Sequence, residues 1–264
     1  KRLGGELLAT GHYARTGHTG DTVALLKAAD SNKDQTYFLH AVSADALAET
    51  VFPLGGLHKA DVRRIAKQQG LAVHDKKDST GICFIGERPF REFLSTYLPA
   101  RPGPILTPAG KELGRHHGLM YYTLGQRQGL GIGGRSDAGD EPWYVVDKYV
   151  EKNALIVDQG DSPLLLSDEL VASEPSWIGH PPDNLDAGLR CTARIRYRQA
   201  DQDCTIRRAL DDRLTVRFDE PQRAAAPGQY IVFYQGDRCL GGAAIETLKR
   251  RADAAQAVPE STIS

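Results

Sequence analysis

Cys83 is the residue whose type and neighbours are most suited to covalent chemistry. A free thiol has a pKa of about 8.5, so only a few per cent of it is thiolate at neutral pH. Nearby cations such as Lys76 and Lys77, or the N-terminus of a helix predicted just after it, can lower that pKa and make the sulfur a nucleophile. The alternative is an inert core cysteine, because free cysteines are often buried and Ile82 and Phe84 are typical of a core strand.

Two segments near the start of the chain are candidates for ligand binding. A short buried strand is predicted over residues 7–10, and Gly11 follows it at the end where an open α/β sheet lets backbone approach a ligand. The polar loop at 30–35 has strong turn and capping character. A plain turn and a solvated loop are the alternatives, but three side chains of this loop also suit a polar polymer: Lys33, Asp34 and Gln35.

A third candidate is a basic stripe on a strand predicted over residues 189–198. Small or apolar residues alternate there with polar ones, so Cys191 points to the core and four arginines to the other face. Such a stripe suits phosphates. It could equally be a solvated face paired with nearby aspartates. The arginines are Arg190, Arg194, Arg196 and Arg198, and the aspartates are Asp201, Asp203, Asp211 and Asp212.

The elements that must position these residues begin with strands alternating with helices. Strands are predicted at 22–28 and 71–73, and helices at 43–51, 59–69 and 89–98. This alternation indicates part of a parallel α/β layer. Further on, short strands at 189–198, 204–210, 214–218, 230–234 and 239–245 indicate a small β-barrel with Cys191 and Cys204 in its core.

The middle of the chain is separated from the first part by four prolines between 99 and 108. A hairpin is predicted from strands at 143–150 and 154–158. His116 and His117 are adjacent and would point to opposite faces of a strand, so we predict no shared metal.

The glycine-rich stretch 129–134 formally matches the dinucleotide-binding pattern G-x-G-x-x-G. The residues after it do not predict a helix, so the context that the pattern needs is missing. We therefore interpret it as a flexible glycine loop, suited to a lid or an RNA contact.

Composition excludes several classes of protein. The chain has 264 residues, 41% of them hydrophobic, and a net charge of −1, so nucleic acid would have to bind a local basic face. Its four cysteines are widely spaced, which is neither a zinc nor a disulfide-scaffold pattern and predicts a reducing, cytoplasmic setting. No apolar run approaches the roughly 20 residues that a membrane helix needs.

Eight sequence blocks, in order along nearly the whole chain, resemble the bacterial tRNA-specific 2-thiouridylase family. They are TGHY (10–13), DSNKDQ (30–35), KDSTGICFIG (77–86), YTLGQR (122–127), GLGIGG (129–134), EPWYVVD (141–147), RYR (196–198) and PGQ (227–229). Together they are highly specific, and the block around Cys83 is the most specific of them.

The resemblance implies a sulfurtransferase acting on the wobble uridine of tRNA anticodons. ATP, with Mg as its usual counter-ion, adenylates the C2 oxygen, and a cysteine persulfide then delivers sulfur to C2. A second cysteine resolves the sulfur, as a disulfide or by releasing bisulfide. Cys83 matches the persulfide-bearing cysteine, which a sulfur-donor protein loads, and Gly11 matches a nucleotide contact. The matched tRNA contacts are His12, Lys33, Asp34, Gln35, Arg196, Tyr197 and Gln229.

One of these matches disagrees with simple alternation along the strand. Arg196 falls on the basic face, but alternation turns Tyr197 toward the core, and both cannot reach RNA from a regular strand. We therefore expect a bulge or the end of the strand near Tyr197.

The resemblance also implies parts that this sequence does not contain. The family's S-G-G-x-D-S nucleotide loop and its N-P-C cysteine motif would precede Lys1, so we expect an N-terminal portion to be missing and the chain alone to be inactive. The expected domains are the C-terminal part of a Rossmann-like adenylating domain (1–98), a small mixed central domain (99–165) and a β-barrel (166–250). A disordered tail (251–264) follows. Two alternatives stay open: another ATP-dependent ligase of the same superfamily, which would not need Cys83, and a non-catalytic RNA-binding module.

Overall fold

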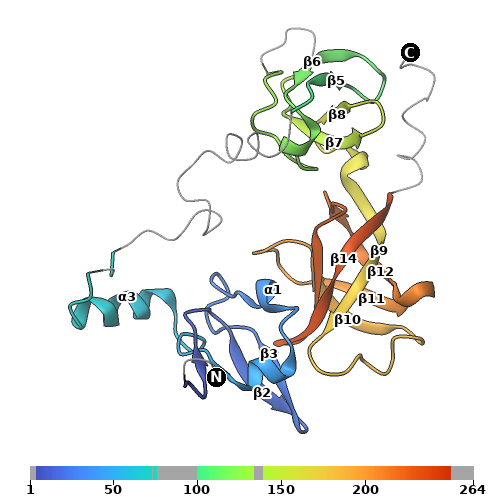
Figure 1. Cartoon of the computed structure of the whole chain (residues 1–264). Helices are drawn as coiled ribbons and strands as arrows, with labels where there is room; N and C mark the ends of the chain where they lie inside the picture. The colour runs from blue at the N-terminus through green and yellow to red at the C-terminus, as the bar shows by residue number, and fades with distance from the viewer. Residues whose placement is uncertain (1–3, 73, 76–99, 134–138, 251–264) are drawn as a thin grey trace. The chain divides into compact units, whose positions relative to one another are not determined.

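The computed structural model describes residues 4–72, 74–75, 100–133 and 139–250, which divide into two compact units (Figure 1). Of the described residues, unit 1 comprises 4–72, 74–75, Glu169–Glu220 and Pro227–Leu248, and unit 2 comprises 100–133, 139–168, Pro221–Ala226 and 249–250. Three predictions lie outside the described residues: the surroundings of Cys83, the helix at 89–98 and the tail. Within the described residues, no helix has the length and apolar character needed to cross a membrane.

Unit 1 contains the predicted β-barrel. Its strands neighbour one another in the order β13, β10, β11, β12, β9 and β14, and the pairing of β13 with β14 closes the barrel. The strands are β9 (Leu166–Trp177), β10 (Leu189–Arg194), β11 (Gln202–Arg208), β12 (Leu214–Arg223), β13 (Tyr230–Gln235) and β14 (Arg238–Arg250). Cys191 and Cys204 face each other across β10 and β11 and are buried, as alternation predicts.

The strand predicted over 189–198 extends four residues beyond the observed strand β10. β10 ends at Arg194, because the amide of Ile195 donates to the Gln199 side chain (2.8 Å) instead of to a neighbouring strand. Arg198 then has a φ of 67°, which no regular strand allows. Of the two expectations, a bulge or the end of the strand near Tyr197, the end of the strand is confirmed.

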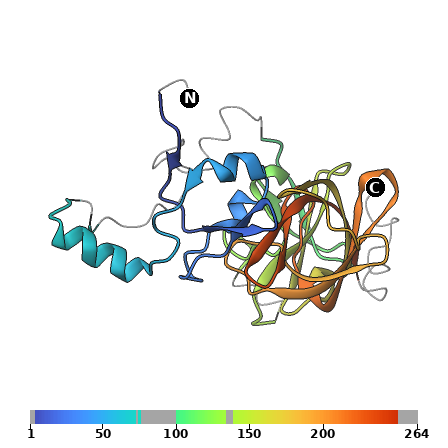
Figure 2. The same cartoon turned by 90° about the horizontal axis from the view of Figure 1, so that it is seen from below.

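A β-hairpin joins the barrel sheet at strand β14 (Figure 2). It consists of β2 (Arg15–Thr19) and β3 (Thr22–Leu26), and β3 pairs antiparallel with β14. The strand predicted at 22–28 is therefore present, but it belongs to the barrel sheet and not to a parallel layer. The packing explains this, because Leu25 lies in one buried cluster with the barrel residues Val232 and Cys239.

The α/β part of unit 1 is small in the described residues. Strands β1 (Leu8–Ala9) and β4 (Thr50–Val51) pair in parallel, and the helices are α1 (Thr36–Leu39), α2 (Ala44–Ala48) and α3 (Lys59–Gln68). Ser43 caps α2 as predicted, accepting a hydrogen bond from the amide of Ala46 (3.3 Å), and Gly70 follows α3 with a φ of 68°. The helix predicted to Val51 stops earlier, because Thr50 and Val51 pair with β1.

Two further predictions for this part are wrong. Leu7 and Leu8 are 62% and 64% exposed, not buried, because no described layer covers β1. Leu71 and Ala72 form no strand.

Unit 2 is built on a sheet in the order β6, β5, β8 and β7. These strands are β5 (Gly103–Leu106), β6 (Glu112–His116), β7 (Trp143–Tyr149) and β8 (Ala154–Gln159), and β7 and β8 form the predicted hairpin. Short 3-10 helices lie at Leu119–Tyr121 (η1) and Pro163–Leu165 (η2) here, and at Leu210–Asp212 (η3) in unit 1. His116 is buried and His117 is exposed, as their alternation predicts.

Candidate RNA interface

A surface hollow of about 380 Å³ in unit 1 brings together three of the sequence-predicted contacts. Arg196 and Tyr197 come from the turn after β10, and Gln229 comes from the loop before β13. The other residues that line the hollow are Tyr37, Ile195, Gly228 and Tyr230. Residues far apart in the sequence thus meet because α1, the end of β10 and the start of β13 are neighbours.

The turn after β10 explains how Tyr197 reaches this surface. Ile195 remains in the core at 2% exposure, while the amide of Gln199 bonds back to the carbonyl of Arg196 (3.2 Å) and reverses the chain. Arg196 is exposed and Tyr197 is half-buried. The basic and the aromatic side chain therefore do not alternate between core and surface as they would on a strand.

Aromatic rings cluster beside the turn. The Phe38 ring lies 4.6 Å from the Tyr197 ring, at an interplanar angle of 44°, and Tyr37 meets Phe38 edge-on at 5.6 Å. The guanidinium of Arg198 lies over the Tyr197 ring at 5.3 Å, within cation–π range. The surface beside the turn thus combines aromatic rings with positive charge.

Tyr37 ties α1 to strand β13. Its hydroxyl donates a hydrogen bond to the carbonyl of Tyr230 (2.8 Å). Burial raises the pKa of Tyr37 to about 12, and the positive charge of nearby Arg196 opposes that rise. Tyr37 is therefore a neutral donor at physiological pH.

Asp34 lies inside the fold. Its side chain is 1% exposed and accepts hydrogen bonds from the amide of Ala28 (3.1 Å), from the Thr36 hydroxyl (2.8 Å) and from Arg194 (2.9 Å). Arg194 also bonds to Asp201 (2.6 Å), so the loop at 30–35 is tied to β10 by buried charges. Any RNA contact by Asp34 in this conformation would use its backbone.

The neighbours of Asp34 also form hydrogen bonds within the fold. Gln35 exchanges two hydrogen bonds with Tyr13, one through its side-chain oxygen and one through its amide, each 2.9 Å long. Lys33 is half-buried, and its amide bonds to the carbonyl of Asp30 (3.0 Å).

Gly11 and His12 follow strand β1. Gly11 is exposed, and an added Cβ would meet no atom within 4 Å, so a ligand could approach its backbone. The His12 ring is held by the Thr10 hydroxyl, 2.7 Å from Nδ1.

Cys83 lies outside the described residues, and the three other cysteines are buried and free. The Sγ atoms of Cys191 and Cys204 are 3.7 Å apart, and this contact, together with burial, raises the pKa of Cys204. Burial raises the pKa of Cys239 to about 12. None of the three has the character of a nucleophile. The described residues also contain no cluster of histidine, cysteine and carboxylate side chains that could hold a metal ion.

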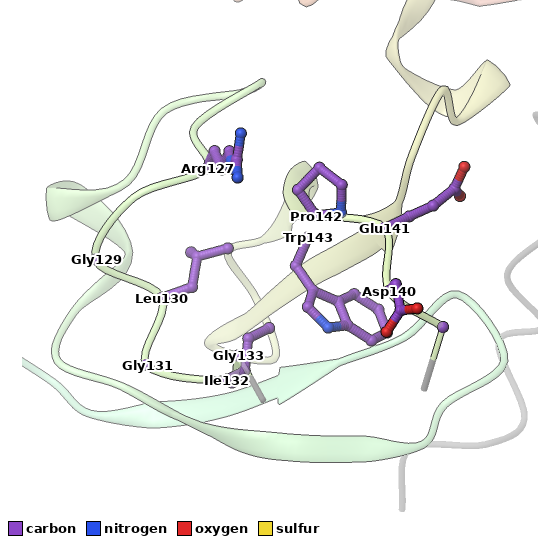
Figure 3. A pocket seen from close by; sticks show the side chains of 11 residues that line it. Arg127, Gly129, Leu130, Gly131, Ile132, Gly133, Asp140, Glu141, Pro142 and Trp143 are labelled. Atoms are coloured by element: carbon purple, nitrogen blue, oxygen red, sulfur yellow. The ribbon is translucent and has the colours of Figure 1, made fainter. Parts of the chain in front are cut away.

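The glycine loop of unit 2 borders a separate pocket of about 340 Å³ (Figure 3). Gly129 and Gly131 have φ values of 77° and 69°, which glycine adopts freely, and the residues that follow each of them, Leu130 and Ile132, are buried. Trp143 and Asp140 are among the residues that line the pocket (Figure 3). Residues 134–138, directly after the loop, lie outside the described residues, so whether the loop is a lid or an RNA contact stays a prediction.

Sequence reasoning missed the aromatic part of the interface. Tyr37 and Phe38 lie two and three residues after the predicted loop, and Tyr230 follows Gln229 directly, so nearness in sequence to predicted contacts is the one signal that could have found them. Nothing local in the sequence indicates that these rings meet.

Family models match all three parts of the chain. Residues 1–87 match the tRNA methyl transferase HUP domain, and residues 91–159 match the tRNA methyl transferase PRC-barrel domain. Residues 167–245 match the aminomethyltransferase beta-barrel domain. The predicted fold class is thereby confirmed: a partial Rossmann-like domain, a small central domain and a C-terminal β-barrel.

Curated relatives match nearly the whole chain. The tRNA-specific 2-thiouridylase MnmA of Pseudomonas entomophila (strain L48) is 57% identical over 246 residues, which are 93% of this chain and 65% of that protein. The protein of the same name from Methylococcus capsulatus (strain ATCC 33009 / NCIMB 11132 / Bath) is 56% identical over 260 residues, which are 96% of this chain and 69% of that protein. This chain spans about two thirds of the length of these relatives. At this identity and coverage, the chain belongs to the family of tRNA-specific 2-thiouridylases.

Proposed function

We propose that this chain is the RNA-binding and persulfide-bearing part of an enzyme that converts the wobble uridine of tRNA to 2-thiouridine. The observation that carries the proposal is the hollow in which Arg196, Tyr197 and Gln229 meet. The family resemblance implies that each of these residues contacts tRNA, and the fold brings Gln229 to the same surface as Arg196 and Tyr197. Guanidinium groups beside exposed rings suit the phosphates and unstacked bases of an RNA loop.

The chemistry has two steps in this proposal. The uridine C2 oxygen attacks the α-phosphate of ATP and pyrophosphate leaves, which turns that oxygen into part of a good leaving group. The terminal sulfur of the Cys83 persulfide then attacks C2, and AMP departs with the oxygen. A second cysteine then attacks the Cys83 sulfur, forms a disulfide with it and releases the outer sulfur, which stays on C2. In the alternative order, the same attack on the free persulfide forms the disulfide first, and the released bisulfide attacks C2 and displaces AMP.

Each remaining partner has a place in this scheme. Gly11 lets its backbone approach ATP, for which the open space around it is suitable, and Mg accompanies the nucleotide. A sulfur-donor protein loads Cys83 in the cytoplasm, where tRNA is found. His12, Lys33 and Gln35 contact tRNA, while Asp34 holds the loop at 30–35 against the barrel through Arg194.

The test is a chimera that joins this chain to the part of the Pseudomonas entomophila relative that it does not match. We expect this chimera to restore 2-thiouridine to the tRNA of a bacterial strain that lacks its own enzyme. Mass spectrometry of nucleosides from digested tRNA measures the product.

Two outcomes would favour other functions. A chimera that is soluble and binds tRNA but forms no 2-thiouridine would support a non-catalytic RNA-binding module. A chimera that uses ATP to modify tRNA in another way, with no need for Cys83, would support a different ligase of the same superfamily.

A further inference from the structure

Phe38 is an exposed aromatic residue on the candidate interface to which the proposed function assigns no role. It lies on helix α1 and its residue surface is 56% exposed, although burying a phenylalanine ordinarily stabilises a protein by about 1.5–3 kcal/mol. Single exposed apolar residues are common and need no explanation. Phe38 differs from them because its ring packs against that of Tyr197, a predicted tRNA contact.

The two rings present a continuous aromatic surface. Their centroids are 4.6 Å apart, while Tyr37 holds Phe38 from the side and is itself fixed by its hydrogen bond to Tyr230. The rings are therefore held in place before any ligand binds, so little side-chain entropy remains to be lost on binding.

The charge around this surface suits a polyanion. The Arg198 guanidinium lies over the Tyr197 ring, and Arg196 lines the adjoining hollow. The described residues that line this hollow include no carboxylate. Positive charge beside exposed rings is the arrangement with which proteins hold single-stranded nucleic acid, since the rings stack on bases and the cations follow the phosphates.

We propose that Phe38, together with Tyr197, forms a stacking platform for an unpaired base of single-stranded RNA. The inference rests on the proposed function in assuming that the ligand is RNA, and it adds a residue and a mode of recognition to that function. Stacking tolerates every base, so the platform distinguishes unpaired from paired nucleotides and not one sequence from another.

The test compares Phe38→Leu with Phe38→Trp in the 264-residue chain. The probe is a fluorescein-labelled single-stranded RNA of about ten nucleotides, and fluorescence anisotropy measures its Kd across a salt series. Leucine keeps an apolar contact with Tyr197 but cannot stack on a base. We expect Phe38→Leu to raise the Kd by about five- to 150-fold with an unchanged salt slope, and Phe38→Trp to bind like the unmodified chain.

Two controls isolate stacking. Leu210→Ala removes a side chain that is 82% exposed elsewhere on unit 1, and it should leave the Kd unchanged. The same RNA annealed to its complement should bind Phe38→Leu and the unmodified chain equally, because its bases are already paired.

Three results would overturn the proposal. Unchanged binding by Phe38→Leu would remove Phe38 from the interface, and equal losses on single-stranded and duplex RNA would show that no base is stacked. Equal losses in the leucine and tryptophan variants would mean that Phe38 only packs against Tyr197. This binding needs neither ATP nor sulfur, so its failure is distinguishable from absence of 2-thiouridine in the chimera.

Discussion

Arg190 and Arg196 belong to one predicted basic stripe, yet the structure surrounds them differently. Arg190 on β10 forms a bidentate ion pair with Asp219 on β12, one bond being 2.6 Å long. Arg196 lies beyond the end of β10 and lines the candidate hollow. The stripe is therefore divided: Arg190 fits the interpretation of a solvated face paired with aspartates, and phosphate binding by Arg196 stays a prediction.

This division predicts different effects on RNA binding. Arg196→Ala should weaken binding of different tRNAs about equally and lower the salt slope of log Kd by roughly one unit, because one phosphate contact is lost. Arg190→Ala is the matched control and should leave that slope unchanged. Tyr197→Ala should weaken binding by about 1–3 kcal/mol with little change in slope. If affinity and slope stay the same in Arg196→Ala, that arginine is only part of a solvated surface.

His116 predicts a pH dependence of stability. Burial lowers its pKa below the usual value, more than the hydrogen bond to the carbonyl of Asn153 (2.9 Å) raises it, and the neighbouring Arg115 charge adds to the lowering. In the unfolded chain the His116 imidazole takes up a proton below about pH 6.5, whereas in the folded chain it stays neutral until a lower pH. The free energy of unfolding should therefore fall as pH decreases through that range.

Urea unfolding between pH 8 and 5 checks this prediction. His116→Gln should flatten the pH dependence in part, because burial also lowers the pKa of His40 and leaves a second contribution. His117→Gln, a change at the exposed neighbour, is the control. An identical pH dependence in His116→Gln and the unmodified chain would contradict the assignment.

At the scale of elements, buried charges fasten the loop at 30–35 to the barrel. The Arg194 side chain is 12% exposed and bridges Asp34 on the loop and Asp201 beside β11. Asp34→Ala would leave Arg194 with one carboxylate fewer in a buried site, at a cost of about 3–5 kcal/mol in the free energy of unfolding. Urea unfolding measures this, with Asp237→Ala as the exposed control; equal stabilities of the two variants would contradict the account.

Adjacent glycines give a second prediction at this scale. A Cβ on Gly55 would lie 1.8 Å from the carbonyl oxygen of Ala14, whereas one on Gly56 would meet nothing within 4 Å. Gly55→Ala should therefore lower the free energy of unfolding by roughly 1–3 kcal/mol or more, and Gly56→Ala should change it little. Thermal unfolding of the two variants tests this prediction. Equal melting temperatures would contradict the close approach of Gly55 to Ala14.

Some elements could be predicted from the sequence and others could not, for physical reasons. The Ser43 cap, the stop at Gly70 and the 143–159 hairpin depend on local signals, which the sequence contains. The end of β10 is visible only through the conflict between alternation and the resemblance at Tyr197. The attachment of β3 to β14 and the meeting of Phe38 with Tyr197 depend on contacts between distant segments, for which the sequence has no local signal.

At the scale of the whole molecule, the chain spans about two thirds of the length of its relatives. Its two-stranded parallel pair β1–β4 leaves Leu7, Leu8 and Val51 exposed, although parallel strands are ordinarily covered on both faces. The three-domain boundaries at 98 and 165 stay a prediction, because the compact units join residues from the start and the end of the chain.

The proposed function requires Cys83 to carry the sulfur for tRNA 2-thiolation. The most direct measurement is the amount of 2-thiouridine in tRNA from a deficient strain that expresses the chimera with one cysteine replaced at a time. Cys83→Ser should abolish the product, because a serine hydroxyl cannot carry a sulfane sulfur. Cys191→Ser, Cys204→Ser and Cys239→Ser, which change buried cysteines, should keep substantial product apart from packing losses of roughly 1–3 kcal/mol. Near-normal 2-thiouridine with Cys83→Ser would contradict the account.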